Sequence, residues 1–440
     1  MAIAIHELKQ PYSIDETIQY LQEQTDNFGL FFDLDRLLEY EVHFRLQSEK
    51  LRKEVMKGLG FPKFKLTDNN IIPILTRLGI PDYKFTNKYD ETSFDKNVRA
   101  QIIADESIDQ ELRNIVEAYH KYKAVKYMIS YIPQYTSLPL CNMESYNGHR
   151  MVVAHPTWNK LRTFRIAAAD PSLQNIPRFM KDIITSPKGW RLYRCDSGQI
   201  EPRITYSWQV PDKLIASIIT TYNDAYAGLL HYANLTDEED AVLRKDFSKF
   251  VKMELNDNFK SMRQDLKVLA LSANYGSKNL RVDPALAEKY NRRIVNHPLR
   301  LQFEAEVKEQ VARGVESFKT AFGNIIEVEE TAKYKRGTKA WRGHVERCGM
   351  NNGIQGTASE LMLFSVNESK KIINEHPETH IAFYKHDEGA FYVKDDEYKE
   401  VTSKLFGITA YNVDGWIPID CEAEEGQLKS EEVPSVLCEI

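Results

Sequence analysis

The spacing of apolar and polar residues predicts that the first 150 residues are mainly helical. In residues 33–60, apolar side chains recur at helical spacing, and the run stops at Gly58 and Gly60. Residues 68–81 and 109–132 show the same period. We therefore expect three helices in this part of the chain.

The first of these helices begins beside two carboxylates, Asp33 and Asp35. Aspartate is a preferred helix N-cap, because its side chain accepts a hydrogen bond from a backbone N–H of the first turn. An Asp-x-Asp pair after an apolar run is also compatible with a metal-binding nuclease site. We favour the cap.

The pattern changes in the second half of the chain. Residues 190–196 (WRLYRCD) have a short strand pattern that leads into a turn and a helix, and residues 210–320 are helical and charged. The last 60 or so residues return to strand-like runs, at 379–393 and 416–425. No internal repeat or low-complexity segment interrupts this order.

Length and composition are those of a globular chain. The 440 residues, 42% of them hydrophobic, are enough for more than one compact unit. No stretch approaches 18 consecutive apolar residues, and the N-terminus lacks the basic and apolar regions of a secretory signal, so we expect a cytoplasmic protein. Five cysteines lie far apart without C-x-x-C spacing, which favours reduced thiols over disulfides or a zinc site.

Charge gives a mixed indication about nucleic acid. The net charge of -6 argues against a histone-like binder, but phosphate contacts need only a local basic groove. Residues 119–127 mix lysines with tyrosines, and residues 332–347 carry six Lys or Arg against one Glu. Solvated helix faces would look similar, so both interpretations stay open at this point.

Candidate chemistry starts with carboxylates at strand ends. His386, Asp387 and Glu388 separate two strand-like runs, which would place Asp387 at a hairpin tip, and Asp196 ends the strand at 190–196. A polar turn is the commoner explanation of such a tripeptide. If both strands belong to one sheet, however, the two aspartates could bind a pair of divalent cations about 4 Å apart, as phosphoryl transfer requires.

A third element is the helical run 261–280. Arg263, Lys267, Leu271 and Tyr275 recur every four positions and so form one slightly slanted stripe. The rise from Arg263 to Leu271 is roughly 12 Å, near the distance from the phosphates of a nucleotide to its base. The stripe could hold a nucleoside triphosphate lengthwise, although an ordinary surface helix would also show two basic residues.

These elements, in this order, resemble family A DNA polymerases, the type exemplified by bacterial DNA polymerase I. Weaker likeness extends from about residue 28 to about residue 427. The motifs that carry the resemblance are RIAAADPSLQNIP (165–177), DSGQIEPR (196–203), R-x-x-x-K-x-x-x-L-x-x-x-YG (263–276), R-x-x-x-N-x-x-x-QGTA (347–358) and HDE (386–388).

The resemblance implies an α+β fold with right-hand architecture: a palm on an antiparallel sheet, helical fingers and a helical thumb. It also implies template-directed addition of deoxynucleotides to a primer 3′ end by two-metal-ion nucleotidyl transfer. The expected segments are an N-terminal palm segment at 1–40, a thumb at 41–149, palm at 150–210, fingers at 211–319 and palm again at 320–440.

The resemblance also implies roles for single residues. Asp196 and Asp387 would hold two Mg²⁺, for which Mn²⁺ could substitute, with Glu388 as a supporting acid and Lys267 as a proton donor to pyrophosphate. Glu201 would be the steric gate against ribonucleotides. Nucleotide contacts would further involve Gln199, Arg263, Lys267, Leu271 and Tyr275, and contacts with primer and template would involve Arg165, Gln174, Asn175, Gly276, Arg347, Asn351, Gln355 and His386.

Expected partners are primer-template DNA and dNTPs, with no membrane and a monomeric chain. The likeness to the polymerase core starts within the first 30 or so residues, so we expect no proofreading exonuclease within this chain; a separate exonuclease or processivity factor is a conceivable partner. A compact polymerase of this kind would suit DNA replication or repair in a bacterial or phage-infected cytoplasm, with a phage or other mobile element as the source.

Several residues depart from the family pattern. Leu271 replaces an aromatic residue that contacts the sugar in relatives, which leads to the hypothesis of altered discrimination against 3′-deoxynucleotides. Pro202 is acceptable if it lies in the first helical turn. The other departures are Gly198, Ser272 and Tyr226, which stands where many relatives carry histidine.

Two other functions share part of this pattern. A single-subunit RNA polymerase would share the palm and fingers motifs, but it would be expected to keep the position of Glu201 small. A DNA-binding scaffold without catalysis would be expected to have a broken metal site, whereas Asp196, Asp387, Arg263 and Lys267 are all present.

Overall fold

The computed structural model describes residues 2–8, 12–61, 65–86, 92–254, 256–274 and 284–425. The described chain is α+β and divides into two compact units. The first unit contains Met1–Leu30, His155–Gln174 and Gly189–Gly426, and the described part of the second contains Phe31–Ala154 and Asn175–Lys188. Of the described helices, none is both long and apolar enough to cross a membrane.

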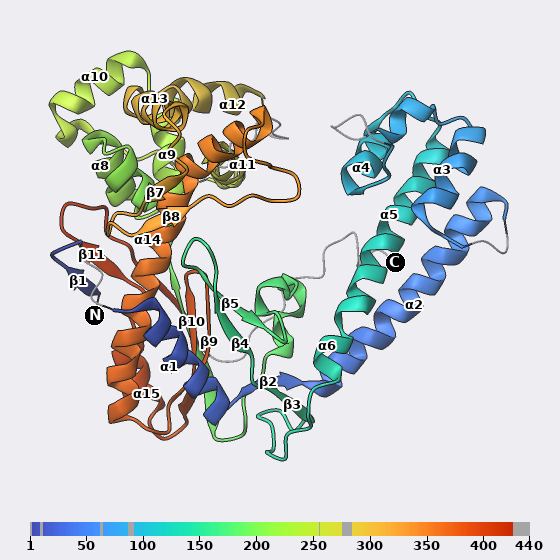
Figure 1. Ribbon diagram of the computed structural model, residues 1–440, viewed down its shortest axis with the longest axis horizontal. Helices are drawn as coiled ribbons and strands as arrows, with labels where there is room; N and C mark the ends of the chain where they lie inside the picture. Colours follow the sequence, from blue (N-terminus) through green and yellow to red (C-terminus); the bar gives the residue numbers. More distant parts are fainter. Residues whose placement is uncertain are drawn as a thin grey trace. The chain divides into compact units, whose positions relative to one another are not determined.

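The second unit is built on two long helices, α2 and α5, which pack along each other (Figure 1). Stacked rings fill its core; for example, the ring centroids of Phe94 and Tyr119 lie 5.5 Å apart. The three helices expected between residues 33 and 132 are confirmed. The elements are β2 (Leu30–Asp33), α2 (Leu34–Leu59), α3 (Asp68–Arg77), α4 (Lys96–Ala104), α5 (Gln110–Tyr131), α6 (Pro133–Thr136) and β3 (Met151–Ala154).

The ends of α2 follow the sequence prediction. Asp33 is the N-cap, accepting a hydrogen bond from the backbone N–H of Arg36 at 2.9 Å. At the other end Gly60 has φ 75°, a left-handed conformation that glycine adopts without steric cost. The Asp35 carboxylate is ion-paired with Arg150. Asp33 is thus a helix cap and Asp35 is part of an ion pair, and these structural roles account for the two aspartates better than a nuclease site does.

The first unit contains a four-stranded antiparallel sheet in the order β12-β6-β10-β9. The predicted strand at 190–196 is β6 (Trp190–Ser197), and the predicted hairpin is formed by β9 (His380–Lys385) and β10 (Glu388–Lys394). In the expected run 416–425, only Cys421–Glu425 is a strand, β12. The hairpin tip is tight, since His386 takes a left-handed φ of 57°.

Three helices pack around this sheet: α1 (Ile14–Asn27), α14 (Lys339–Glu375) and α15 (Tyr398–Leu405) (Figure 1). The sequence did not predict α14, although it is 37 residues long. Its middle is buried on nearly all sides, so it lacks the one-sided apolar period by which helices are recognised. A Cβ on Gly353 would lie 2.9 Å from the carbonyl oxygen of Lys319, so this glycine lets α14 approach its neighbours.

The predicted helical region 210–320 is confirmed. These helices share an apolar core, and α8 and α9 touch so closely that a Cβ on Gly228 would lie 2.9 Å from Cα of Ile219. The helices are α8 (Lys213–Tyr222), α9 (Ala225–Asn234), α10 (Asp237–Lys245), α11 (Asp257–Asn274), α12 (Pro284–Tyr290) and α13 (Pro298–Ala312).

The remaining elements of the first unit are short. Helix α7 begins at Ile200, so Pro202 does lie in its first turn, where its missing N–H costs no hydrogen bond. The described cysteines are free thiols, and Cys438 lies outside the described residues. The short elements are β1 (Ile3–Ile5), β4 (Thr157–Lys160), β5 (Ile166–Ala169), α7 (Ile200–Ile204), β7 (Ser317–Lys319), β8 (Ile325–Glu327) and β11 (Tyr411–Val413).

Helix α14 carries a buried carboxylate whose protonation affects stability. The side chain of Glu360 is fully buried; Oε1 accepts a hydrogen bond from Asn324 at 2.5 Å, and Oε2 has no hydrogen-bond partner. Burial raises the pKa of Glu360 from 4.5 to about 7. The protonated form is therefore favoured by folding, and the resulting stabilisation is present below pH 4.5 and is lost as pH rises through about 7.

We predict that Glu360→Gln stabilises the protein at pH 8 relative to the native chain, by up to about 3 kcal/mol, and much less at pH 5. Denaturant unfolding at both pH values measures the difference. Glu346→Gln is the control, since Glu346 lies on the same helix but pairs with Arg342 at 3.4 Å. An equal effect of Glu360→Gln at both pH values would contradict the assignment.

Candidate active site

A cavity of about 410 Å³ in the first unit brings together residues from distant parts of the sequence. Its walls come from the end of β6, the tip of the β9–β10 hairpin and the helices α7, α9, α11 and α14. Nine residues to which the resemblance assigned a role in the site line it: Arg165, Asp196, Gln199, Glu201, Arg263, Lys267, Leu271, His386 and Asp387.

Asp196 lies near the end of β6, and Asp387 lies in the turn that precedes the adjacent strand β10. Asp196 of β6 is opposite Glu388 of β10 on one side and opposite Glu422 of β12 on the other. The backbone N–H of Ser197 donates to the carbonyl oxygen of Asp387 at 2.9 Å, which holds the hairpin tip against the end of β6. Pairing of β6 with β10 thus brings Asp196 and Asp387 together, although they are far apart in the sequence.

The side chain of Glu388 pairs with an arginine of the sheet and does not enter the cavity. Its carboxylate forms an ion pair with Arg194, and Arg194 also donates to Glu424 at 2.6 Å. Glu388 is not among the residues that line the cavity. Its negative charge still acts on Asp196, but its side chain is engaged on the sheet.

Both aspartates of the site have a pKa above the ordinary value of an aspartate. Burial, and after it the negative charges of Asp387, Glu388 and Glu422, raise the pKa of Asp196. Burial also raises the pKa of Asp387, with Glu201 and Glu388 adding to the effect. Ionising these carboxyl groups is therefore costly, because the negative charge would be buried without compensation, and a nearby cation would lower that cost.

The donor set of this end of the cavity suits a hard divalent cation. Carboxylate oxygens are preferred ligands of Mg²⁺, which usually takes only one or two carboxylates and completes its shell with water and substrate phosphates. In the described part of the chain, no three histidine, cysteine or carboxylate side chains gather into a closed metal-binding cluster. The residues therefore fit a metal held by two carboxylates and completed by a bound substrate.

Two positively charged side chains of α11 also line the cavity, and we call the part that they line the cationic end. Arg263 and Lys267 come from successive turns of α11, and both lie over the ring of Tyr226, at 5.7 and 5.8 Å from its centroid. Leu271 follows on the same helix and also lines the cavity. Tyr275 and Gly276 lie outside the described residues.

A neutralised pair also lines the cavity. Arg165 donates to Glu201 at 2.6 Å, and the Glu201 side chain is mostly buried. Burial and then Arg165 lower the pKa of His386 to about 4, so this imidazole is neutral at physiological pH. His386 can therefore contact a ligand as a neutral hydrogen-bonding group.

The remaining predicted residues do not line the cavity. Arg347, Asn351 and Gln355 lie along one side of α14, where Asn351 Oδ1 is buried without a hydrogen-bond partner. Gln174, with its amide in the bonding orientation, exchanges hydrogen bonds with the backbone of Ala168 at 3.1 and 2.9 Å. Asn175 belongs to the second unit.

Sequence reasoning missed several residues of the site. Glu422 and Ser359 line the cavity, and Asp224 pairs with Arg263 at 2.6 Å. Glu422 lies in a strand-like run, but nothing in the spacing shows that this run pairs with β6. Asp224 directly precedes the helical run at 225, so a helix cap was the only local signal it offered.

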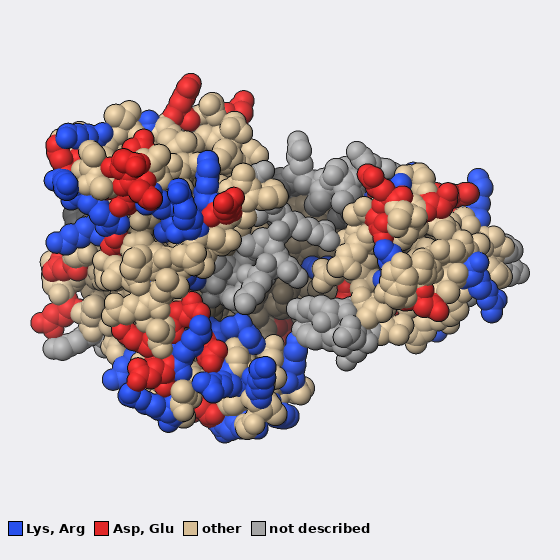
Figure 2. All heavy atoms as spheres, turned by 90° about the horizontal axis from the view of Figure 1, so that it is seen from above, with Lys and Arg blue, Asp and Glu red and all other residues tan. Residues whose placement is uncertain are grey.

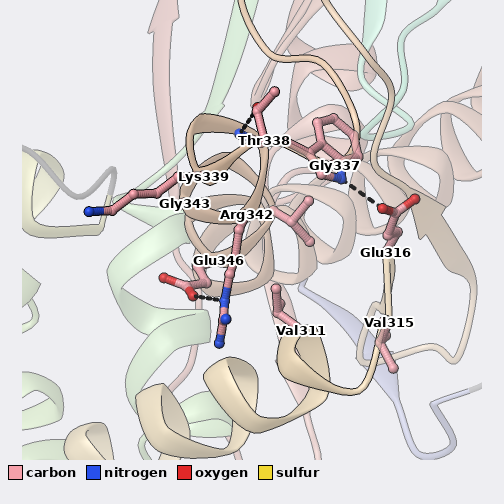
Figure 3. Close-up of a pocket in the computed structure, with 12 residues that line it drawn as sticks. Val311, Val315, Glu316, Gly337, Thr338, Lys339, Arg342, Gly343 and Glu346 are labelled. Atoms are coloured by element: carbon pink, nitrogen blue, oxygen red, sulfur yellow. Dashed lines mark hydrogen bonds and ion pairs between the residues drawn. The ribbon is translucent and has the colours of Figure 1, made fainter.

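A larger hollow of about 690 Å³ lies elsewhere in the first unit, between α13, β7 and the start of α14 (Figure 3). Both of its carboxylates have partners: Glu316 accepts a hydrogen bond from Trp341 at 2.7 Å, and Glu346 pairs with Arg342. On the face of the molecule in Figure 2, acidic and basic side chains are likewise interspersed. The 410 Å³ cavity, which is lined by Asp196 and Asp387 and by Arg263 and Lys267, is the candidate active site.

Comparison with known proteins defines the class to which this fold and site belong. The sequence profile described as "DNA polymerase family A" matches residues 34–430, so the chain belongs to that family of DNA-directed DNA polymerases. The resemblance seen in the motifs is thereby confirmed.

Individual relatives are distant. DNA polymerase I of Caldicellulosiruptor bescii is 25% identical over 283 residues, which cover 60% of this chain and 30% of the relative. DNA polymerase I of Pseudomonas aeruginosa is 25% identical over 279 residues, covering 60% and 28%. The matched region is thus less than a third of the length of either relative.

A solved structure shows the same fold. The POL domain of Pol1 from M. smegmatis, in complex with DNA primer-template and dNTP, superposes with a TM-score of 0.73 at 18% identity. The superposition covers 94% of this chain and 69% of that chain. The expected α+β fold of right-hand type is therefore confirmed.

Proposed function

We propose that this chain extends a DNA primer, adding dNTPs in the order dictated by a template strand. The observation that carries the proposal is the convergence of Asp196, Asp387, Arg263 and Lys267 on one cavity. Phosphoryl transfer needs little covalent chemistry from the protein, and is achieved mainly by positioning and by stabilising negative charge. A cavity with carboxylates at one end and two cations at the other meets that need.

The carboxylate end would hold the divalent ions, with Asp196 and Asp387 as ligands. Bound Mg²⁺, or Mn²⁺ in its place, would supply Lewis-acid activation of the primer 3′-hydroxyl and would neutralise the triphosphate. Ionisation of both carboxylates is then favoured by the metal, which reverses the upward shift of their pKa values. Glu388 and Glu422 add negative potential from the neighbouring strands.

The cationic end would receive the triphosphate. Arg263 can present a planar set of donors to phosphate oxygens, and Lys267 can donate a proton to the departing pyrophosphate. Gln199, Leu271 and Tyr275 would complete the nucleotide site. Glu201, fixed by Arg165, would stand beside the sugar as the steric gate.

The double helix would be contacted beyond the cavity. The row of Arg347, Asn351 and Gln355 on α14 would make the minor-groove and template contacts. His386 would lie at the primer terminus, and Arg165, Gln174, Asn175 and Gly276 complete the proposed set. DNA replication or repair would be the setting for this activity.

The proposed division follows the right hand: a thumb at 41–149, fingers at 211–319 and a palm formed by 1–40, 150–210 and 320–440. The sheet with Asp196 and Asp387 lies in the proposed palm, and α11 with Arg263 and Lys267 lies in the proposed fingers. Helix α5 and most of α2, which begins at Leu34, lie in the proposed thumb.

We predict that Asp387→Ala lowers primer extension by at least about 10³-fold, because a metal-binding carboxylate contributes to charge stabilisation in the transition state. Duplex binding should change less than about threefold, since most phosphate contacts remain. Extension in Mg²⁺ and a gel shift of the same primer-template measure both effects.

Glu424→Gln is the matched control, because Glu424 lies on the same sheet and pairs with Arg194 but does not line the cavity. It should extend primers at nearly the native rate. Full activity of Asp387→Ala would overturn the metal assignment.

The leucine at position 271, where relatives carry an aromatic residue, leads to a prediction about discrimination between nucleotides. A phenylalanine in place of Leu271 would fill the cavity beside the sugar and make binding depend more on the 3′-hydroxyl. We expect Leu271→Phe to raise the preference for dNTP over ddNTP by about fivefold or more, which corresponds to about 1 kcal/mol of differential stabilisation. Competitive single-nucleotide incorporation measures the ratio, and equal discrimination by the two proteins would reject the hypothesis.

A further inference from the structure

The arginine at the cationic end already has an anionic partner. Nε and Nη2 of Arg263 both donate to Oδ2 of Asp224, at 2.7 and 2.6 Å. The two side chains are 27% and 28% exposed, so the pair is in partial contact with water. The edge of the guanidinium formed by Nε and Nη2 is thus already occupied by a carboxylate.

The fold fixes Asp224 in this position. Its Oδ1 accepts a hydrogen bond from the backbone N–H of Ala227 at 2.9 Å and so caps α9, which leaves Oδ2 for Arg263. The backbone N–H of Ala225, the residue after Asp224, donates to Gln199 Oε1 at 2.5 Å. Because Gln199 follows Asp196 by only three residues, the turn that carries Asp224 is tied to the carboxylate end of the site.

Tyr226 differs from Asp224 in its effect on an anion. Its ring lies near both Arg263 and Lys267, and a ring attracts cations without a net negative charge. It can therefore position the two cations and leave their charge available. Asp224 positions Arg263 as well, but it also cancels the charge of Arg263 and repels any phosphate that approaches.

We propose that Asp224 is an internal counter-ion that competes with the triphosphate for Arg263 and so sets the affinity for the nucleotide. This inference rests on the proposed function of the cavity. Its consequence is selectivity for polyphosphates, since a ligand must carry enough negative charge to displace a carboxylate from Arg263. Asp224 is a positioning and specificity residue and takes no part in bond making.

Asp224 has two opposing effects on nucleotide binding. It orients Arg263, which favours binding, but a partly exposed ion pair contributes little. Asp224 also places a negative charge beside the binding site of a triphosphate, which carries several negative charges, and this repulsion acts at short range in a partly buried cavity. The repulsion outweighs the benefit of orienting Arg263, so removing the charge should strengthen nucleotide binding.

The test is Asp224→Asn, because asparagine is an equally good helix cap and keeps α9 intact. We expect the KM for dNTP and the inhibition constant of pyrophosphate to fall by about three- to tenfold, with kcat within about twofold of native. Asp237→Asn is the control, since it also removes one negative charge from an arginine pair, but its partner, Arg293 at 2.7 Å, does not line the cavity as Arg263 does.

A double variant shows whether the effect acts through Arg263. In an Arg263→Ala background, Asp224→Asn should no longer lower the KM, because the two residues are coupled. An unchanged or raised KM in Asp224→Asn, or the same fall in the Arg263→Ala background, would overturn the proposal. Thermal unfolding of each variant shows that it is folded.

Failure of the proposed function would look different. If the native chain extended no primer at all, the polymerase proposal would fall, but calorimetric binding of pyrophosphate to the native protein and to Asp224→Asn would still test the counter-ion. Tighter pyrophosphate binding by the variant supports the role of Asp224, and equal or weaker binding overturns it.

Discussion

The constraint on which the rest of the structure depends is the burial of two carboxylates side by side. Asp196 and Asp387 lose most of their contact with water, and the charge of Asp387 raises the cost of ionising Asp196 further. Two arginines of the same region are already engaged, Arg194 with Glu388 and Arg165 with Glu201. Such an arrangement is unfavourable for the protein alone and becomes favourable when a cation from outside binds.

The surrounding fold is organised to hold this arrangement. Strand pairing places Asp196 opposite Glu388, and the bond from Ser197 to the carbonyl of Asp387 fixes the hairpin tip. A shift of the β6–β10 register by one residue would send every side chain to the other face of the sheet. The buried apolar residues of β9 and β10 make that shift costly, so the hydrophobic core of the sheet also sets the geometry of the site.

The elements that could be predicted from sequence are those that local signals define. Asp33, Gly60 and the apolar period between them define α2, and the polar tripeptide at 386–388 defines the hairpin. Helix α14 was not predicted, because a helix buried on most sides has no polar face to reveal its period. Contacts across the fold were beyond prediction for a related reason: Glu422 meets Asp196 through pairing of two strands far apart in sequence, and Asp224 meets Arg263 between two helices. Arg263 and Lys267, in contrast, were found because both lie on one helix, where spacing alone shows that they share a face.

The two ends of the cavity carry opposite charge, and they differ in whether that charge has a partner within the protein. At the carboxylate end the like charges have no free internal counter-ion among the described residues, so the site is strongly biased toward binding a cation. At the cationic end Arg263 is paired with an internal carboxylate, and Lys267 lies over an aromatic ring. On the proposed function, a metal bound at the carboxylate end would relieve repulsion, whereas a triphosphate bound at the cationic end would have to exchange partners with Asp224. A triphosphate that arrives with its own metal would meet both conditions at once.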